Sequence, residues 1–247
     1  ASASAGPAFE GAECRGGMRA TSGAIDHIRL LDANRVLNYS TVNSAAPVGI
    51  CGTGYVDLIA EMLRAGLVDK TGRLCPDAAP ARVREGHHGE LEYVVINADE
   101  AGGDDDIVIT QGDINNILRA KGAVYAAACV LLNAMGMTFG DVSEVMVAGA
   151  FGNFLNVSNA VFIGLLPDID RDRLRFVGNA SITGAKLAAI CRECYEEISR
   201  IADRTTYFEL STDPSYMDQF VSACFFPHTD VERFASVMEE MGLGKGT

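Results

Sequence analysis

Runs of apolar residues separated by glycine-rich turns predict a chain in which strands and helices alternate. Two alternating runs, 24–31 and 35–42, flank a short polar turn and predict a β-hairpin. After a glycine cluster, apolar residues recur at helical spacing over 55–65 and stop at Gly66, which is typical of a helix that ends at a glycine cap. The following segment, 67–90, is interrupted by prolines and glycines, so we expect a surface excursion there.

The second half of the chain repeats a strand-then-helix pattern. Strands are predicted at 91–97, 107–110, 144–148, 174–177 and near 207–210, and helices at about 112–135, 158–163, 180–200, 214–225 and 231–241. This alternation indicates an α/β fold with a mixed, largely parallel sheet flanked by helices. We expect two parts: an N-terminal portion over 1–90 with the hairpin and the glycine-loop helix, and an α/β core over 91–247 that ends in a helical extension.

The charge balance narrows the classes of partner. The chain has 247 residues, with 33 acidic and 20 basic side chains and a formal net charge of -13. Nucleic acids and anionic membrane surfaces attract clustered Lys and Arg, so this balance argues against both. A ligand that carries phosphate must then be held locally, by main-chain N–H groups and helix N-termini.

Two uncharged stretches, 122–140 and 145–167, are long enough to raise the question of a membrane span. The first has a central Asn133, and the second contains glycines and asparagines. We therefore expect both to be packed core elements. The start of the chain has no basic segment followed by an apolar one, so no secretory signal is expected.

Seven cysteines are scattered through apolar or helical context. An odd, scattered set is typical of reduced thiols, so we expect a cytoplasmic protein. Only Cys191 and Cys194 have the spacing of metal ligands, and no second pair or His lies at zinc spacing from them. The pair is therefore interpreted as residues on a helix face, with metal binding as the alternative. We predict that this chain holds neither a structural metal nor an iron–sulfur cluster.

Two glycine clusters are candidate ligand sites. The apolar strand near 145 runs into a turn with Gly149 and Gly152, and a glycine at a strand end lets a flat ring or a phosphate approach the main chain. The alternative is an ordinary tight turn. The second cluster, at 49–54, opens onto a helix whose first N–H groups favour an anion, although Thr53 as a simple N-cap explains it equally well.

Lys121 is a third candidate, because helical spacing places it on an inward stripe. The stripe contains Ile114, Leu118 and Tyr125 on the helix predicted at 112–135. A cation on such a face needs a partner, which is either a carboxylate or a bound ligand.

Nucleophilic and metal chemistry have little support in the sequence. Three of the four histidines lie in apparent loops, and His27 is interpreted as a core or surface residue, so no Ser–His–Asp or Cys–His set is expected. The acidic loop over 99–106 lacks the spacing of a calcium loop and is predicted to be a solvated turn.

An ordered set of motifs resembles the C-terminal part of the reductive activators of corrinoid proteins. The resemblance covers nearly the whole chain and is carried by 4–12, 17–20, 23–25, 49–54, 109–114, 148–152 and 178–180. It implies an actin-like ATPase domain of the sugar kinase, heat-shock chaperone and actin superfamily, which has a ribonuclease H-like lobe. Members of the family are longer and carry a [2Fe-2S] ferredoxin domain upstream.

The resemblance also implies an activity. Such proteins couple ATP hydrolysis to electron transfer from an iron–sulfur donor onto a Co(II) corrinoid, which gives Co(I). The implied cofactors are ATP with Mg, with the [2Fe-2S] cluster only in a domain absent from this chain. The implied partner is the corrinoid protein of a methyltransferase system, and a homodimer is a further expectation. Full-length members hydrolyse ATP, whereas this fragment alone is expected to be inactive.

The same resemblance assigns roles to particular residues, with the core over 91–247 as the nucleotide-binding part. The adenosine motif is matched by 147–153, and the second connecting helix by 178–184. Lys121 stands where chaperone relatives place a basic residue beside the adenine. The expected ligand-binding residues are Gly52, Thr53, Gly54, Lys121, Gly149, Ala150, Phe151, Gly152 and Asn153. The phosphate loops and the catalytic residues are expected upstream of this chain.

Two rival functions stay open at this point. The first is a docking or dimerisation module that keeps the actin-like fold without nucleotide chemistry, since a fold does not determine a function. The second is a phosphotransferase of the sugar-kinase type, for which no Asp base in a sugar pocket is identified.

Overall fold

The computed structural model describes residues 1–32, 35–86, 89–149 and 154–243. Its strands form three small sheets, with the orders β2-β1-β3, β4-β5-β6 and β7-β8. The strands are β1 (Ala24–Asp32), β2 (Arg35–Thr41), β3 (Gly49–Ile50), β4 (Val83–Glu85), β5 (Leu91–Ile96), β6 (Ile107–Thr110), β7 (Val145–Val147) and β8 (Leu174–Phe176). Only β1–β3 and β7–β8 are parallel pairs. Within the described residues, antiparallel strand pairs therefore outnumber parallel ones, whereas the sequence predicted a largely parallel sheet. The reason is that the links between β1 and β2 and between β4 and β5 are short, and short links permit only antiparallel neighbours.

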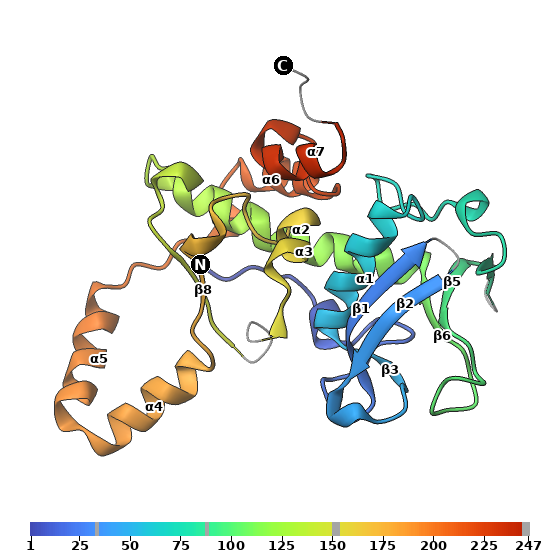
Figure 1. The fold of residues 1–247 in the computed structure, drawn as a ribbon. Helices are drawn as coiled ribbons and strands as arrows, with labels where there is room; N and C mark the ends of the chain where they lie inside the picture. Colours follow the sequence, from blue (N-terminus) through green and yellow to red (C-terminus); the bar gives the residue numbers. More distant parts are fainter. Residues whose placement is uncertain (33–34, 87–88, 150–153, 244–247) are drawn as a thin grey trace.

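Seven α-helices lie between and beside these sheets in the described part of the chain. They are α1 (Gly52–Arg64), α2 (Gln111–Ala134), α3 (Val157–Phe162), α4 (Ala180–Ile190), α5 (Arg192–Arg204), α6 (Tyr216–Ala223) and α7 (Ala235–Glu240). In Figure 1, α2 crosses the middle of the molecule, with α6 and α7 along one side of it.

Helix α2 has a well-defined start and a buried course. The Thr110 side chain accepts the N–H of Asp113, and the Asp113 carboxylate accepts the N–H of Thr110 at 2.9 Å, so the two residues form a capping box. By length and composition α2 is apolar enough to cross a membrane, but 61% of its most apolar window is buried inside the protein. This burial agrees with the prediction of a packed core helix.

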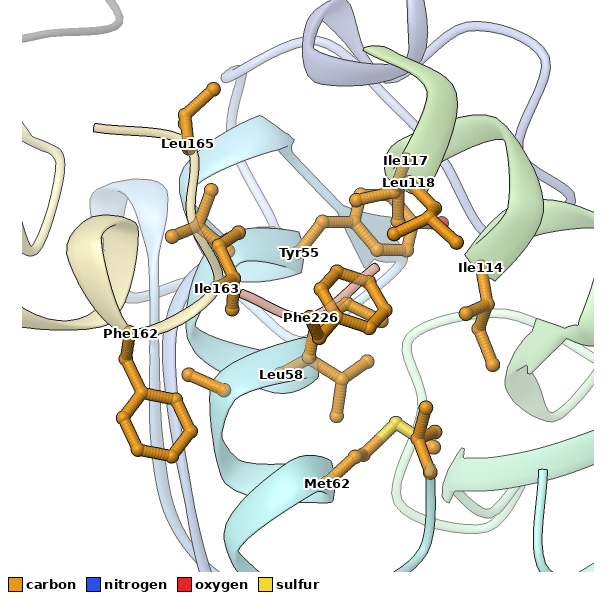
Figure 2. Packing of buried hydrophobic residues seen from close by; sticks show 14 of the residues in the cluster. Tyr55, Leu58, Met62, Ile114, Ile117, Leu118, Phe162, Ile163, Leu165 and Phe226 are labelled. Atoms are coloured by element: carbon orange, nitrogen blue, oxygen red, sulfur yellow. The ribbon is translucent and has the colours of Figure 1, made fainter. Parts of the chain in front are cut away.

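The main core forms where α1, α2 and α3 meet the segment that follows α6. Figure 2 shows Tyr55, Leu58 and Met62 of α1 pointing toward side chains from the other three elements. Their partners are Ile114, Ile117, Leu118, Phe162, Ile163, Leu165 and Phe226. The same helix packs its other side on β1, so α1 is enclosed along most of its length. Burial of this apolar surface stabilises the whole N-terminal half.

The segment over 67–90 differs from the predicted surface excursion. Leu67, Val68 and Leu74 are buried in the core, and Val83 begins strand β4, which pairs with β5. The pairing also joins the two parts that the sequence divided at residue 90. Prolines and glycines signalled the turns correctly, but the apolar residues between them pack inward.

Two predictions near the C-terminus are wrong. The helix predicted at 180–200 is two helices, α4 and α5, because Cys191 between them has an extended backbone (φ -133°, ψ 115°). The segment predicted as a strand near 207–210 forms no strand, and a short 3-10 turn begins at Leu210. A segment with no neighbouring strand cannot form the main-chain hydrogen bonds of a sheet. Neither α4 nor α5 has a buried residue, and Figure 1 shows them extending away from the rest of the chain.

Candidate functional site

A cavity of about 710 Å³ lies at the N-terminus of α1. Five short stretches within the first 53 residues line it together with Phe154. The lining residues are Phe9, Glu10, Met18, Arg19, Ala20, Asp26, Thr41, Val42, Asn43, Cys51, Gly52, Thr53 and Phe154. The cavity therefore brings together three of the motif segments that the sequence singled out, 4–12, 17–20 and 49–54.

The first turn of α1 leaves its main-chain donors without a side-chain cap. Cys51 stands at the N-cap position in an extended conformation, and no side chain accepts the first N–H groups. Thr53 is the second residue of the helix and not the N-cap, and its Oγ1 lies 3.2 Å from the Cys51 Sγ. The capping alternative is therefore wrong. Uncapped N–H groups and the positive end of the helix favour an anion at this point.

The charged side chains around the cavity are few. Arg19 is the one cation among the described lining residues, and Glu10 and Asp26 are the carboxylates. Asp26 accepts a hydrogen bond from Ser40 at 2.6 Å, so one of its oxygens is already occupied. An anionic ligand would thus meet one guanidinium beside the end of the helix.

Two glycines near the cavity allow main-chain segments to pack closely against each other. A Cβ on Gly54 would lie 2.3 Å from the carbonyl oxygen of Ile25, and one on Gly11 would lie 2.1 Å from that of Met18. Gly54 is not among the lining residues, because its α-carbon is pressed against strand β1. Of the three predicted anion-binding residues, Gly52 and Thr53 face the cavity and Gly54 instead allows α1 to approach β1 closely.

The predicted adenosine motif begins at the end of β7. Gly149 follows the strand with φ +111°, its N–H donates to the Gly178 carbonyl at 2.7 Å, and no atom stands where its Cβ would be. Ala150, Phe151, Gly152 and Asn153 lie outside the described residues. The next residue, Phe154, is 61% exposed and lines the cavity. Open space thus lies beside Gly149, and Phe154 is the described residue near the motif that lines the cavity.

Lys121 lies elsewhere, completely buried on α2. Its Nζ donates hydrogen bonds to the carbonyl oxygens of Phe225 and, at 2.6 Å, of Pro227, just after α6. The inward position was predicted correctly, but the partners are main-chain carbonyls and not a carboxylate. Burial lowers the pKa of Lys121 to about 7. A contact with a ligand would require the segment around Phe226 to move, so that role stays a prediction.

A second and larger cavity, of about 910 Å³, lies between the β1–β2 hairpin, α1 and the start of α3. Beside it, the buried Asp57 accepts from Asn159 Nδ2 at 2.6 Å and shares a hydrogen bond of 2.9 Å with His27 Nδ1. Arg64 donates to the Asn159 amide oxygen at 2.8 Å. Both oxygens of Asp57 are thus used inside the protein, which fastens α1 to β1 and α3. The sequence contained a sign of this cluster, because Asp57 is an acidic residue inside an apolar helical pattern. The sequence analysis considered His27 by itself and did not connect it with Asp57.

The acidic loop between β5 and β6 is also tied into the protein. Asp106 accepts the N–H of Ala98 at 2.8 Å and pairs with Arg84 at 2.8 Å. Across the part of the chain that the structure describes, no group of three or more His, Cys, Asp or Glu side chains is placed to hold a metal ion.

Comparison with known proteins adds the family. Residues 1–238 match the family described as the C-terminal domain of RACo, the ASKHA domain. The chain belongs to this family. A solved structure titled "Reductive activator for corrinoid,iron-sulfur protein" has 45% sequence identity and a TM-score of 0.90, and the match covers 95% of this chain and 37% of the other. The predicted actin-like α/β fold is therefore confirmed.

Two curated proteins are also similar over most of the chain. The corrinoid activation enzyme RamQ of Eubacterium limosum is 38% identical over 232 residues, which are 92% of this chain and 39% of the relative. The [Co(II) methylated amine-specific corrinoid protein] reductase of Methanosarcina barkeri is 26% identical over 226 residues, 83% of this chain and 38% of the relative. This chain thus spans about two fifths of the length of the relatives it matches.

Proposed function

We propose that this chain forms the adenosine-side lobe of an ATP-dependent reductive activator of a corrinoid protein. In this proposal the complete protein passes electrons from an iron–sulfur donor to an inactive Co(II) corrinoid and restores Co(I). The names of the relatives and their close similarity support the general role. The observation that supports the nucleotide role is the 710 Å³ cavity, which is lined by the uncapped start of α1 and by Phe154.

The residues around this cavity fit a nucleotide in shape and charge. Phe154 and Phe9 provide an apolar wall for the base or the ribose. The first N–H groups of α1 and the guanidinium of Arg19 suit phosphate oxygens. Glu10 and Asp26 are the carboxylates that would face Mg²⁺, which is held largely by the phosphates themselves.

In this proposal, ATP drives the electron transfer to the corrinoid through a change of conformation that ATP binding favours. Closure of two lobes around a nucleotide is a two-state element of this kind. In this proposal α1 and the β7 turn form one wall, and the upstream lobe of the complete protein forms the other. The relatives' names support a corrinoid protein as the partner, and we propose that it belongs to a methyltransferase system.

Arg19→Met should weaken ATP binding by about tenfold in a full-length protein that contains this chain. The substitution removes the one described cation of the cavity and keeps an apolar stem, and a hydrogen bond to a charged group contributes about 1.5 kcal/mol or more. Calorimetric titration measures the affinity. Adenosine, which has no phosphate, should bind wild type and variant equally well.

Arg29→Met is the matched control, because Arg29 lines the other cavity. Equal ATP affinity in all three proteins would remove Arg19 from the site. Formation of Co(I) from a Co(II) corrinoid protein, followed by its absorbance, tests the whole activity. Reduction without any dependence on ATP would contradict the proposed function and favour the docking module.

A further inference from the structure

Cys191 and Cys194 stand together at the corner between α4 and α5. Cys191 is the single residue that joins the two helices, and it is the N-cap of α5. Its Sγ accepts the N–H of Cys194 at 3.3 Å, which is the contact that an N-cap side chain makes with the third helical residue. This hydrogen bond places the Cys191 sulfur beside the main chain of Cys194.

The two sulfurs are in contact and reachable from solvent. A hydrogen bond with Cys191 raises the pKa of the Cys194 thiol. Both residues are half-buried, whereas Cys14, Cys51 and Cys129 are buried. A disulfide requires Cβ atoms about 3.5–4.5 Å apart, so the corner at Cys191 must adjust for the two sulfurs to reach bonding distance.

The surroundings make Cys191 the thiol that reacts first. Its sulfur accepts the N–H of Cys194 at the start of a 13-residue helix, so it is the sulfur that lies at the helix end. The Cys191 Sγ–H also donates to the carboxylate of the exposed Glu193 at 3.4 Å. Cys194, with its thiol proton retained longer, is placed to react second.

We propose that Cys191 and Cys194 are a redox-active pair that forms a reversible disulfide with a small-molecule disulfide such as oxidised glutathione. The Cys191 thiolate attacks one sulfur of glutathione disulfide, which forms a mixed disulfide and releases one glutathione thiolate. The Cys194 thiolate then attacks the Cys191 sulfur, closes the intramolecular bond and releases the second glutathione. Two protein thiols are oxidised, one glutathione disulfide is reduced to two thiols, and the protein's two protons pass to the released thiolates through water.

A disulfide between Cys191 and Cys194 would restrict the angle between α4 and α5. Both helices lack buried residues, and Cys191 joins them. A disulfide from the joining residue to the first turn of α5 fixes that turn, and thus restricts the angle between α4 and α5. Reduction releases it. The redox state of the surroundings would in this way set the shape of a surface that the rest of the chain does not support.

The sequence provides a direct test. Arg192 stands between the two cysteines, so trypsin separates them into the peptides 187–192 and 193–200. The chain is incubated with oxidised glutathione, free thiols are alkylated, and the digest is analysed by mass spectrometry. We expect these two peptides joined by a disulfide as the main oxidised product, and their separation after reduced glutathione is added.

Single variants report the order of the steps. Cys194→Ser should stop the reaction at a stable glutathione adduct on Cys191, formed at least about tenfold faster than an adduct on the half-buried Cys75. Cys191→Ser should abolish the joined peptides, and Cys75→Ser should leave them unchanged. Adducts on Cys75 or Cys224 without joined peptides would overturn the proposal, as would an adduct on Cys191 that persists in the wild-type chain.

Discussion

Replacing Gly54 by alanine is expected to destabilise the folded chain by about 3–4 kcal/mol. The new Cβ would lie 2.3 Å from the Ile25 carbonyl oxygen and 2.9 Å from the Ile50 Cγ2. Neither atom can move cheaply, because β1 and β3 are paired at these residues and α1 is packed on both sides. Helix α1 must shift away from β1, which opens the main core and costs more than ordinary overpacking. Urea unfolding measures the loss as a lower midpoint.

Gly184→Ala in α4 is the matched control. It is also a helical glycine, but no atom lies within 4 Å of its Cβ position. Alanine is preferred to glycine inside a helix, so this variant should be as stable as wild type or more stable by up to about 1 kcal/mol. Equal midpoints for Gly54→Ala and the wild-type chain would show that α1 does not approach β1 as closely as described.

Lys121→Met is expected to cost about 2–3 kcal/mol at pH 9. Methionine fills the same apolar channel but leaves the carbonyl oxygens of Phe225 and Pro227 without their donor. Buried acceptors that lose a partner carry their full desolvation cost. The segment after α6, which places Phe226 in the main core, should loosen first. Lys186→Met, at an exposed position on α4, is the control and should have little effect.

The pH dependence of stability gives a second signature of Lys121. Its pKa is about 7 in the folded chain, against an ordinary value of 10.5 for a solvated lysine, so between these values the unfolded chain binds more protons. Stability of the wild type therefore rises with pH across this window, by up to about 1.4 kcal/mol per pH unit from this group, and falls again as pH drops toward 7. Subtracting the Lys121→Met profile removes the other titrating groups. A difference that stays constant from pH 7 to 10 would contradict the buried lysine.

Local patterns predicted the elements that depend on local chemistry. The hairpin of β1 and β2, the stop of α1 before Gly66 and the inward face of α2 all follow from spacing, and the structure has them. The break at Cys191 was not predicted, because the residues on both sides are good helix formers and only the backbone shows that the N-cap lies there. Propensity averaged over a window cannot reveal a corner made by one residue.

The candidate site was predictable in its parts but not in its assembly. The glycine cluster around Gly52 was found from its spacing, yet the presence of Phe9 and Phe154 in the same cavity depends on how distant segments pack. The partners of Lys121 lie more than a hundred positions away and are main-chain carbonyls, which any residue has. A sequence shows which side chain needs a partner, but not which peptide groups will supply it.

The exposed apolar residues of helix α4 create a risk of misfolding or aggregation while the chain is being synthesised. Ile190 at its end is 83% exposed, and Lys186 is its one charged residue. On the ribosome, Phe226 emerges 36 residues after Ile190, so at about 5–20 residues per second the apolar helix is outside for about 2–7 s before the main core can close. During those seconds the apolar residues of the unformed core and those of α4 can associate with each other or with neighbouring chains. Slow translation or a crowded polysome would therefore reduce the yield of folded protein, even though the finished fold is unchanged.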